Sequence, residues 1–287
     1  MTNDEKIQIA LVIMIMANWR CELLDIKGAF LHGDFEDGNN VYMEVPEGFD
    51  KYYDPMYYVL LLLQTIYGLK QSAMAFWRQL LKAFRSMKFN RSKADPCLYY
   101  AWTALGLVLW ISWIDDCLVV GKPEAVKKAK RKLTDRFDCD EVGNMYEYVG
   151  CKLERNYEER WIKFTQPVLL QSFTDEFDLP DEKPPRTPAE AGSMITACKP
   201  EDAMPEKLQS EYRSGVGKLL HMMRWSRPEL LNSVRECSKA MQVSAFAHLK
   251  VMYRIMNYCV ATPNRGLLLK PEGTWNGDKD FEFEIEG

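Results

Sequence analysis

The sequence predicts an α+β protein in which a strand-rich first half is followed by a mostly helical second half. In the first half, short apolar runs rich in β-branched and aromatic residues alternate with segments of helical periodicity. Beyond Ser210, apolar residues recur mainly at helical spacing. The 287 residues, 47% hydrophobic and 27% charged, are typical of a soluble globular protein with one large domain or two ordinary ones.

Cysteine usage and the apolar start of the chain indicate its surroundings. The eight cysteines are scattered singly, without a CxxC pair or a Cys/His cluster at zinc spacing, which predicts reduced thiols in an intracellular protein, cytoplasmic or nuclear. The apolar run from Ile7 to Ala17 is shorter than the roughly 20 residues that span a bilayer. Asp4 and Glu5 precede it, which argues against a secretory signal. We therefore predict a buried helix here and no membrane partner.

The strands expected in the first half include a hairpin. Residues 41–45 alternate apolar and polar side chains and end at a proline, as a short strand does. The apolar runs 107–114 and 117–120 are separated only by Asp115 and Asp116. Aspartate tolerates tight-turn geometry, so the pattern predicts a β-hairpin with these two residues at its tip.

The rest of the chain is expected to contain helices, one further strand pair and a linker. In chain order we predict a helix at 72–87, a helix from Pro123 to about Phe137, strands near 146–153 and 161–164, a proline-rich linker at 179–188, a helical region at 210–241 interrupted by Pro228, a helix at 246–260, and a final strand at 281–285.

Positive charge is local in this chain, whose net charge is −4 and whose pI is about 5.6. Binding of phosphates requires local rather than total positive charge. On the 72–87 helix, Arg78, Lys82 and Arg85 fall on one face. The run KKAKRKL, from Lys127 to Leu133, forms a second basic stretch. Either stretch contacts phosphates or is simply a solvated helix surface, and charge alone does not decide between the two.

Three aspartates are candidates for metal chemistry. Asp115 and Asp116 would lie close together at the hairpin tip, and Asp25 follows the apolar run 21–24 on what would be a neighbouring strand. Two-metal phosphoryl transfer uses ions about 4 Å apart. Magnesium prefers such carboxylate oxygens, and crowding them without metal raises a carboxyl pKa. Taken alone, an Asp-Asp pair between strands is more often only a turn.

Six blocks of the sequence resemble copia-type retrotransposon reverse transcriptases, in the family's order and approximate spacing. They cover nearly the whole chain, which chance does not readily produce. The blocks are LLDIKGAFLHGDFEDGNNVYMEVPEGF (23–49), IYGLKQSAMAFW (66–77), WIDDCLVVG (113–121), YVGCKLERN (148–156), SGVGKLLHMMRWSRPELLNSV (214–234) and HLKVMYRIMNYCVATPNRGLLL (248–269).

The resemblance implies a polymerase fold. It implies a palm, built as an antiparallel sheet with helices on one face, together with residual fingers and followed by a mostly helical thumb. The implied domains are a palm with incomplete fingers at 1–165, a thumb at 166–245 after and around the 179–188 linker, and a connection stub at 246–287 before a missing ribonuclease H domain. Relative to the family, the chain is expected to be a fragment truncated at both ends.

The implied activity is RNA-directed DNA polymerisation by two-metal nucleotidyl transfer. The implied partners are an RNA template, a DNA primer, deoxynucleotides and two Mg²⁺ ions, with Mn²⁺ as a substitute. By position in the blocks, the implied catalytic and metal-binding residues are Asp25, Asp115 and Asp116. The implied nucleotide-binding residues are Phe30, which would act as a steric gate against the 2′-hydroxyl, and Gln71. The implied nucleic-acid-binding residues are Tyr148 and Gly150, together with Arg78, Lys82 and Arg85 on the basic helix.

Some positions depart from the family pattern, and other interpretations stay open. Trp113 replaces the usual Tyr or Phe, while Ala73 and Met74 replace a proline and a basic residue. One alternative is a non-catalytic retrotransposon relic that at most binds nucleic acid. Another is a different two-metal phosphoesterase or nucleotidyl cyclase, which explains the aspartates but not the GLKQS block. The sequence leaves the oligomeric state open.

Overall fold

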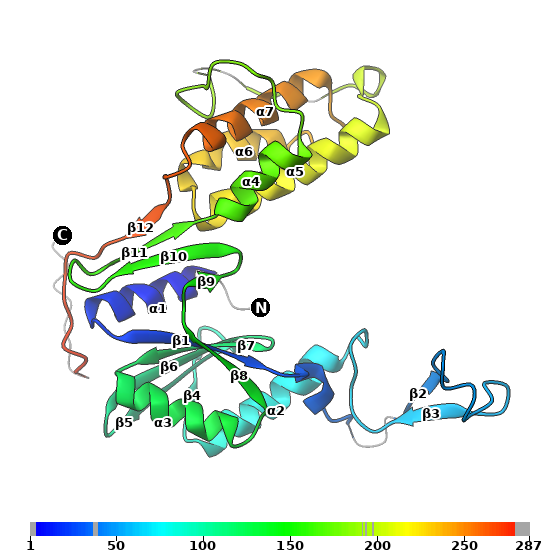
Figure 1. Ribbon diagram of the computed structural model, residues 1–287, viewed down its shortest axis with the longest axis vertical. Helices are drawn as coiled ribbons and strands as arrows, with labels where there is room; N and C mark the ends of the chain where they lie inside the picture. The colour runs from blue at the N-terminus through cyan, green and yellow to red at the C-terminus, as the bar shows by residue number, and fades with distance from the viewer. Residues whose placement is uncertain (1–3, 37–39, 191, 193, 197, 279–287) are drawn as a thin grey trace. The chain divides into compact units, whose positions relative to one another are not determined.

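The computed structural model describes residues 4–36, 40–190, 192, 194–196 and 198–278 (Figure 1). The chain forms two compact units. The first comprises Met1–Met145 with Glu272–Gly287, and the second comprises Tyr146–Pro271. The predicted boundary at 165 lies inside the second unit, because the strands that follow Tyr146 pair with one another and with a strand after residue 265.

The first unit is built on a six-stranded antiparallel sheet. In spatial order its strands are β4 (Asn90–Arg91), β5 (Leu98–Thr103), β6 (Gly106–Trp113), β7 (Asp116–Gly121), β1 (Arg20–Ile26) and β8 (Cys139–Asn144). The strand that follows the N-terminal helix in sequence, β1, thus lies between β7 and β8 and is paired on both edges.

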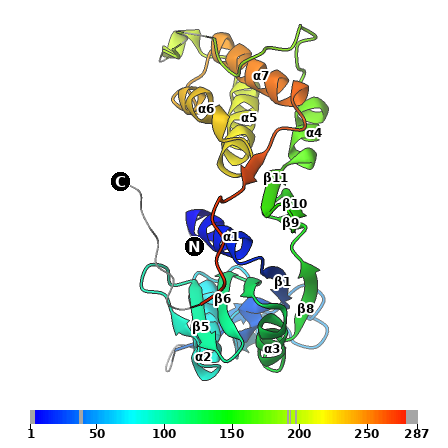
Figure 2. The same ribbon diagram turned by 90° about the vertical axis from the view of Figure 1, so that its left-hand side faces the viewer.

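Helices cover both faces of this sheet, as Figures 1 and 2 show. The helices α2 (Ser72–Ser86) and α3 (Pro123–Thr134) share one core with the sheet, in which Phe84 and Val126 pack with Trp110. The helix α1 (Asp4–Met16), predicted as a buried helix, lies on the other face. The expectation of helices on one face therefore holds for α2 and α3 but not for α1. The strand β6 is apolar and buried on both of its faces, so helices or other elements must shield both faces of the sheet from water.

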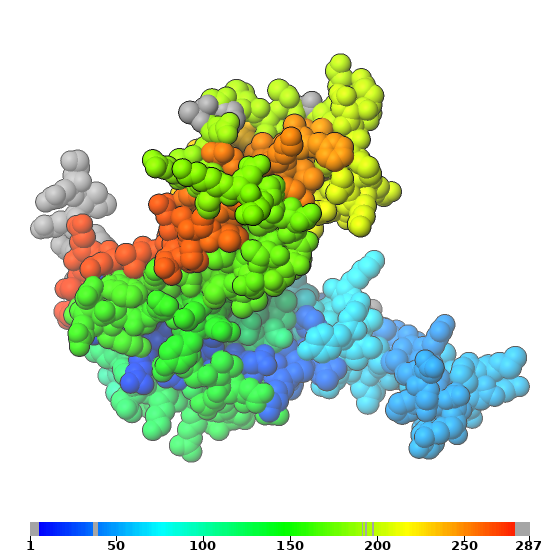
Figure 3. All heavy atoms as spheres, turned by 45° about the horizontal axis from the view of Figure 1, so that its top comes forward, coloured from blue at the N-terminus to red at the C-terminus, as the bar shows by residue number. Residues whose placement is uncertain are grey.

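A separate two-stranded sheet carries the segment between β1 and α2. A short 3₁₀ helix, η1 (Ala29–His32), leads to the arm formed by β2 (Val41–Glu44) and β3 (Val59–Leu62). Tyr42 and Leu61, which pair across the arm, are both exposed. The atoms of the arm appear in blue to cyan in Figure 3.

The second unit combines a four-stranded antiparallel sheet with four α-helices among its described residues. The sheet order is β12 (Leu267–Leu269), β11 (Trp161–Thr165), β10 (Cys151–Asn156) and β9 (Glu147–Tyr148). The helices are α4 (Pro167–Glu176), α5 (Glu206–Trp225), α6 (Leu231–Ser238) and α7 (Phe246–Ala261), with the short 3₁₀ helices η2 (Pro200–Asp202) and η3 (Pro228–Leu230).

Most predicted elements of this half appear in the structure. The strand pair is β10 with β11, and Pro228 begins η3 between α5 and α6, as its interruption of the helical pattern predicts. Residues 179–188 contain neither helix nor strand. The strand predicted at 281–285 lies outside the described residues. Across the described chain, no helix is long and apolar enough to cross a bilayer.

Candidate carboxylate site

The β6–β7 hairpin positions two of the three candidate aspartates. Trp113 pairs with Asp116, so the two-residue turn consists of Ile114 and Asp115, and Asp116 is the first residue of β7. The hairpin prediction is confirmed, but its turn begins one residue earlier than predicted. Ile114 adopts the left-handed conformation with φ 58°, which is unfavourable for a β-branched residue and marks local strain at the tip.

Asp25 lies beside this tip, on β1. Its Cα is the direct partner of the Asp116 Cα in the β1–β7 ladder. The backbone N–H of Ile26 donates a hydrogen bond to the carbonyl oxygen of Asp115, at 3.0 Å. All three aspartates are therefore gathered at one end of the central strands, although Asp25 is separated from the other two by some ninety residues.

Two of the side chains point to the side of the sheet opposite α2 and α3. Leu24 and Ile26 on β1, and Cys117 on β7, belong to the core beneath those helices. Side chains alternate between the faces of a strand. Asp25 and Asp116, which alternate with these core residues, therefore lie on the opposite face.

Crowding changes the acidity of this cluster. Burial, followed by the nearby charges of Asp115 and Asp140, raises the pKa of Asp25, while Lys27 opposes the shift. Burial, followed by the charges of Asp115 and Asp25, likewise raises the pKa of Asp116. Like charges held together in this way are relieved by a bound cation.

Two further charged residues at this site escaped the sequence reasoning. Asp140, on β8, is the Cα partner of Asp25 on its other side. The Lys27 Nζ lies 2.9 Å from a carboxylate oxygen of Asp140 and 3.6 Å from one of Asp138. The spacing of two between Asp25 and Lys27 was an available signal, because it places both on one side of an extended chain. The polar sequence of β8 contains no comparable signal for Asp140.

The donor set fits a hard divalent cation that completes its coordination from elsewhere. Among the residues that the structure describes, no three His, Cys, Asp or Glu side chains form a ready-made metal cluster. Magnesium, however, usually takes one or two protein carboxylates and fills its remaining positions with water and substrate phosphates. The neighbouring carboxylates of Asp25 and Asp116, with Asp115 in the adjoining β6–β7 turn, can provide ligands of this kind.

The predicted nucleotide-binding residues lie on the elements around the cluster. Phe30 is on η1 and is partly buried against the α2–α3 core. Its ring centroid lies 4.8 Å from that of Tyr67, in an edge-to-face arrangement. Gln71 is exposed at the residue before α2, and its side chain makes no capping hydrogen bond there.

The predicted nucleic-acid-binding residues are divided between the two units. Arg78, Lys82 and Arg85 are on the exposed side of α2, which covers the other face of the sheet, and Arg78 forms an ion pair with Glu36. Tyr148 belongs to the second unit.

Within the second unit, Tyr148 is a core residue. Its side chain is buried, with its ring centroid 6.1 Å from that of Trp225. Gly150 is exposed in the β9–β10 turn with φ 71°, a conformation that favours glycine.

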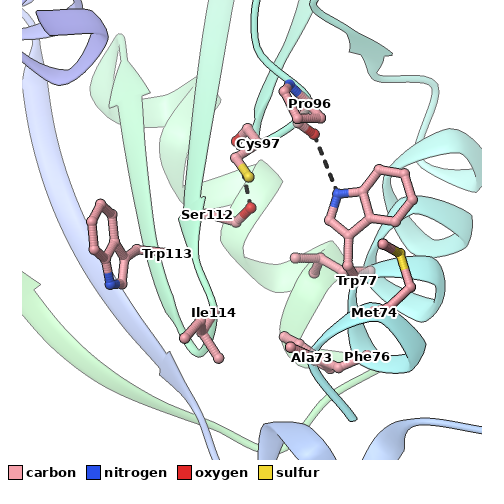
Figure 4. Close-up of a pocket in the computed structure, with 10 residues that line it drawn as sticks. Ala73, Met74, Phe76, Trp77, Pro96, Cys97, Ser112, Trp113 and Ile114 are labelled. Atoms are coloured by element: carbon pink, nitrogen blue, oxygen red, sulfur yellow. Dashed lines mark hydrogen bonds between the residues drawn. The ribbon is translucent and has the colours of Figure 1, made fainter. Parts of the chain in front are cut away.

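A pocket of about 430 Å³ lies between α2 and the end of β6, and its wall reaches the turn residue Ile114 (Figure 4). Its lining is largely apolar, and the Trp77 indole N–H donates a hydrogen bond to the carbonyl of Pro96 at its rim. The three positions that depart from the copia-type blocks, Ala73, Met74 and Trp113, all line this pocket.

Comparisons with known proteins agree with the resemblance of the blocks. Residues 2–191 match the family described as "Reverse transcriptase (RNA-dependent DNA polymerase)". The chain is 28% identical to the retrovirus-related Pol polyprotein from transposon TNT 1-94 of Nicotiana tabacum, over 84% of this chain and 18% of that protein. It is also 28% identical to the corresponding polyprotein from transposon RE1 of Arabidopsis thaliana, over 98% of this chain and 19% of that protein.

A shorter relative is similar over most of its own length. The putative transposon Ty5-1 protein of Saccharomyces cerevisiae is 24% identical, over 86% of this chain and 78% of that protein. The chain thus spans about a fifth of the plant polyproteins that it matches, and most of the yeast protein.

Proposed function

This chain belongs to the reverse transcriptase (RNA-dependent DNA polymerase) family as a copia-like domain, and on that premise we propose that it adds deoxynucleotides to a primer at Asp25, Asp115 and Asp116. The observation that carries the proposal is the register of the central strands. It sets Asp25 opposite Asp116, with Asp115 in the adjoining turn. The nucleic-acid template and the nucleotide follow from the family.

The three aspartates divide the work of holding metal and substrate. Two Mg²⁺ ions, or Mn²⁺ in their place, would activate the primer 3′-hydroxyl and steady the leaving pyrophosphate. Asp25 and Asp115 are the proposed ligands of both ions, and Asp116 is less directly engaged. The raised pKa values of Asp25 and Asp116 support a cation at this cluster, because a cation favours the ionised forms that crowding disfavours.

The surrounding residues position the nucleotide. Phe30, held against Tyr67, would lie under the sugar and exclude a 2′-hydroxyl, which selects deoxynucleotides. The exposed amide of Gln71 would contact the nascent base pair. In this proposal the six-stranded sheet is the palm, the β2–β3 arm is the residual fingers, and the helices of the second unit are the thumb, with Tyr148 and Gly150 near the primer end.

The test is primer extension on an RNA template with purified protein and Mg²⁺. Asp115→Asn should abolish extension without changing the circular dichroism spectrum or lowering the melting temperature. Asp135→Asn, an exposed change after α3 that removes the same charge, is the matched control and should extend as the wild type does.

The same assay separates the alternatives. Extension that persists in Asp115→Asn would contradict the assignment of the metal ligands. Wild-type protein that binds the template–primer but does not extend it would instead favour the non-catalytic relic.

A further inference from the structure

The segment around α3 concentrates positive charge in an otherwise acidic chain. Residues 122–136 contain seven Lys or Arg residues and two acidic residues, a net charge of +5, whereas the whole chain carries −4. Four of these cations form what we call the α3 basic face: Lys127, Lys128, Arg131 and Lys132. The proposed polymerase site uses none of them.

The α3 basic face is one compact patch. Residues three and four positions apart are neighbours on a helix surface. The pairs 127/131 and 128/132 are four apart and the pair 128/131 is three apart, so the four cations cover adjacent turns on one side. All four side chains are exposed. The opposite side of α3 is fixed in the core by Val126, Ala129 and Leu133. Since that side cannot turn outward without unfolding the helix, the orientation of the basic face is set by packing.

The nearby acids do not neutralise this face. Lys130, in the middle of the run, turns inward, and its Nζ lies 2.6 Å from a Glu22 oxygen and 2.5 Å from a Glu141 oxygen. Within the part of the chain that the structure describes, none of the four residues of the α3 basic face forms an ion pair with a carboxylate. Glu124 and Asp135, each four positions from one of these cations, offset their mutual repulsion only in part, and an external polyanion would relieve the rest.

We propose that the α3 basic face binds the phosphate backbone of nucleic acid as a second surface, on the side of the sheet opposite the side chains of Asp25 and Asp116. The proposal rests on the proposed function only for the choice of nucleic acid as the polyanion. A membrane surface fits less well, because an interfacial helix inserts an exposed apolar face, whereas the apolar side of α3 is buried. A protein partner that binds the basic segment 127–133 as an extended peptide would have to unfold α3.

The experiment measures binding of a fluorescein-labelled RNA–DNA hybrid duplex by fluorescence anisotropy at several salt concentrations. In the test variant, Lys127, Lys128, Arg131 and Lys132 are all changed to Gln, which favours helix and leaves Lys130 in place. Each phosphate contact contributes about 0.9 to the slope of log affinity against log salt. Loss of four contacts should reduce the magnitude of the slope by about 3 to 4. Over a roughly fourfold rise in salt, the affinity of the variant should therefore fall roughly 100-fold less than that of the wild type.

The control variant removes the same charge elsewhere. It carries Gln at four exposed lysines that lie outside α3 and outside the helices of the second unit, Lys88, Lys93, Lys183 and Lys199, and should keep most of the wild-type slope. If the four-site α3 variant does not fold by circular dichroism, the pair Lys128→Gln and Arg131→Gln should lower the slope by about 2.

The outcomes decide the proposal one way or the other. An unchanged slope in the α3 variant, or an equal loss in both variants, would overturn it. So would a loss of binding to phosphatidylserine vesicles without a loss of binding to the duplex. The assay measures binding and requires no nucleotide incorporation. Asp115→Asn should therefore keep the part of the salt dependence of affinity that depends on the α3 basic face. A chain that never extends a primer but shows that slope would contradict the proposed function alone.

Discussion

Asp25 and Asp116 face each other directly across the β1–β7 ladder. Like charges in that position destabilise a sheet, and here Asp115 adds a third charge from the adjoining turn. The native fold therefore carries a local electrostatic cost at one end of its central strands. That cost is measurable on the protein without metal, independently of any enzymatic activity.

The first prediction is that Asp116→Asn stabilises the metal-free protein at neutral pH. The folded-state pKa of Asp116 is raised, so the protonated form is favoured by folding and the charged form opposes it. Because the residue is largely exposed, solvent screening limits the expected gain in unfolding free energy to about 1 kcal/mol or less near pH 7. Urea denaturation across the pH range measures it.

The pH dependence supplies the check. The advantage of Asp116→Asn should shrink as pH falls through the raised folded-state pKa and vanish below the ordinary value of 3.8, where Asp116 is protonated in both states. Asp135→Asn, measured at the same pH values, is the control for the removal of one exposed carboxylate. A variant less stable than wild type at pH 7 would mean that the aspartates do not repel one another there.

The same pair shows what sequence reasoning reaches and where it stops. Two apolar runs with a two-residue interval identified the β6–β7 hairpin, and an apolar run before Asp25 identified a strand. The observed turn begins one residue before the predicted one, because Ile114 occupies its first position. This position is left-handed, and local propensity favours aspartate or glycine there over a β-branched residue. Tertiary pairing overrides that preference.

The strands at the sheet's margins were harder to predict. The sequence of β8, CDEVGN, contains acidic residues and a glycine and lacks the alternation of a strand. It is extended because β1 supplies its hydrogen-bond partners, and a pairing between segments so distant in sequence leaves no local trace. For this reason the sequence does not indicate that Asp140 is a neighbour of Asp25.

The second prediction concerns the proposed steric gate. Phe30→Ala should increase incorporation of ribonucleotides relative to deoxynucleotides by at least about tenfold, because the space beneath the sugar would accept a 2′-hydroxyl. Competition between labelled nucleotides in primer extension measures the ratio. Leu31→Ala, an exposed neighbour on η1, should leave it unchanged. An unchanged ratio in Phe30→Ala would make Phe30 a packing residue only.

The third prediction concerns the anchor of α3. Burial alone would lower the pKa of Lys130, but hydrogen bonds and charges from Glu141 and Glu22 outweigh it and raise the pKa. The contribution of Lys130 is therefore present at neutral pH and is lost only when pH rises through that raised value, above 10.5. Lys130→Met should cost about 1–3 kcal/mol of unfolding free energy at pH 7, since it leaves Glu22 partly buried without its partner.

A double variant distinguishes the loss of the pair from the loss of packing. Adding Glu22→Gln to Lys130→Met removes the unpaired charge and should recover part of the stability. If the double variant is as unstable as the sum of the two single variants, the lysine stem and not the ion pair holds α3 to the sheet.

The fourth prediction tests the close approach of η1 to α2, which positions Phe30. Gly33 follows η1, and a Cβ added there would lie 2.3 Å from the Thr65 Oγ and 2.8 Å from the Ala75 Cβ. The Thr65 hydroxyl itself donates a hydrogen bond to the Phe30 carbonyl. Gly33→Ala should therefore push α2 and the Thr65 segment away from η1 and cost about 1–3 kcal/mol of unfolding free energy.

A second glycine gives the matched control. Gly217, on the exposed side of α5, has no atom within 4 Å of an added Cβ, so Gly217→Ala should stabilise the protein by about 0.5–1 kcal/mol through helix propensity. Adding Thr65→Ala to Gly33→Ala removes the nearest clashing atom and should restore part of the stability. If urea denaturation shows Gly33→Ala to be as stable as wild type, Phe30 is not held in place by this contact.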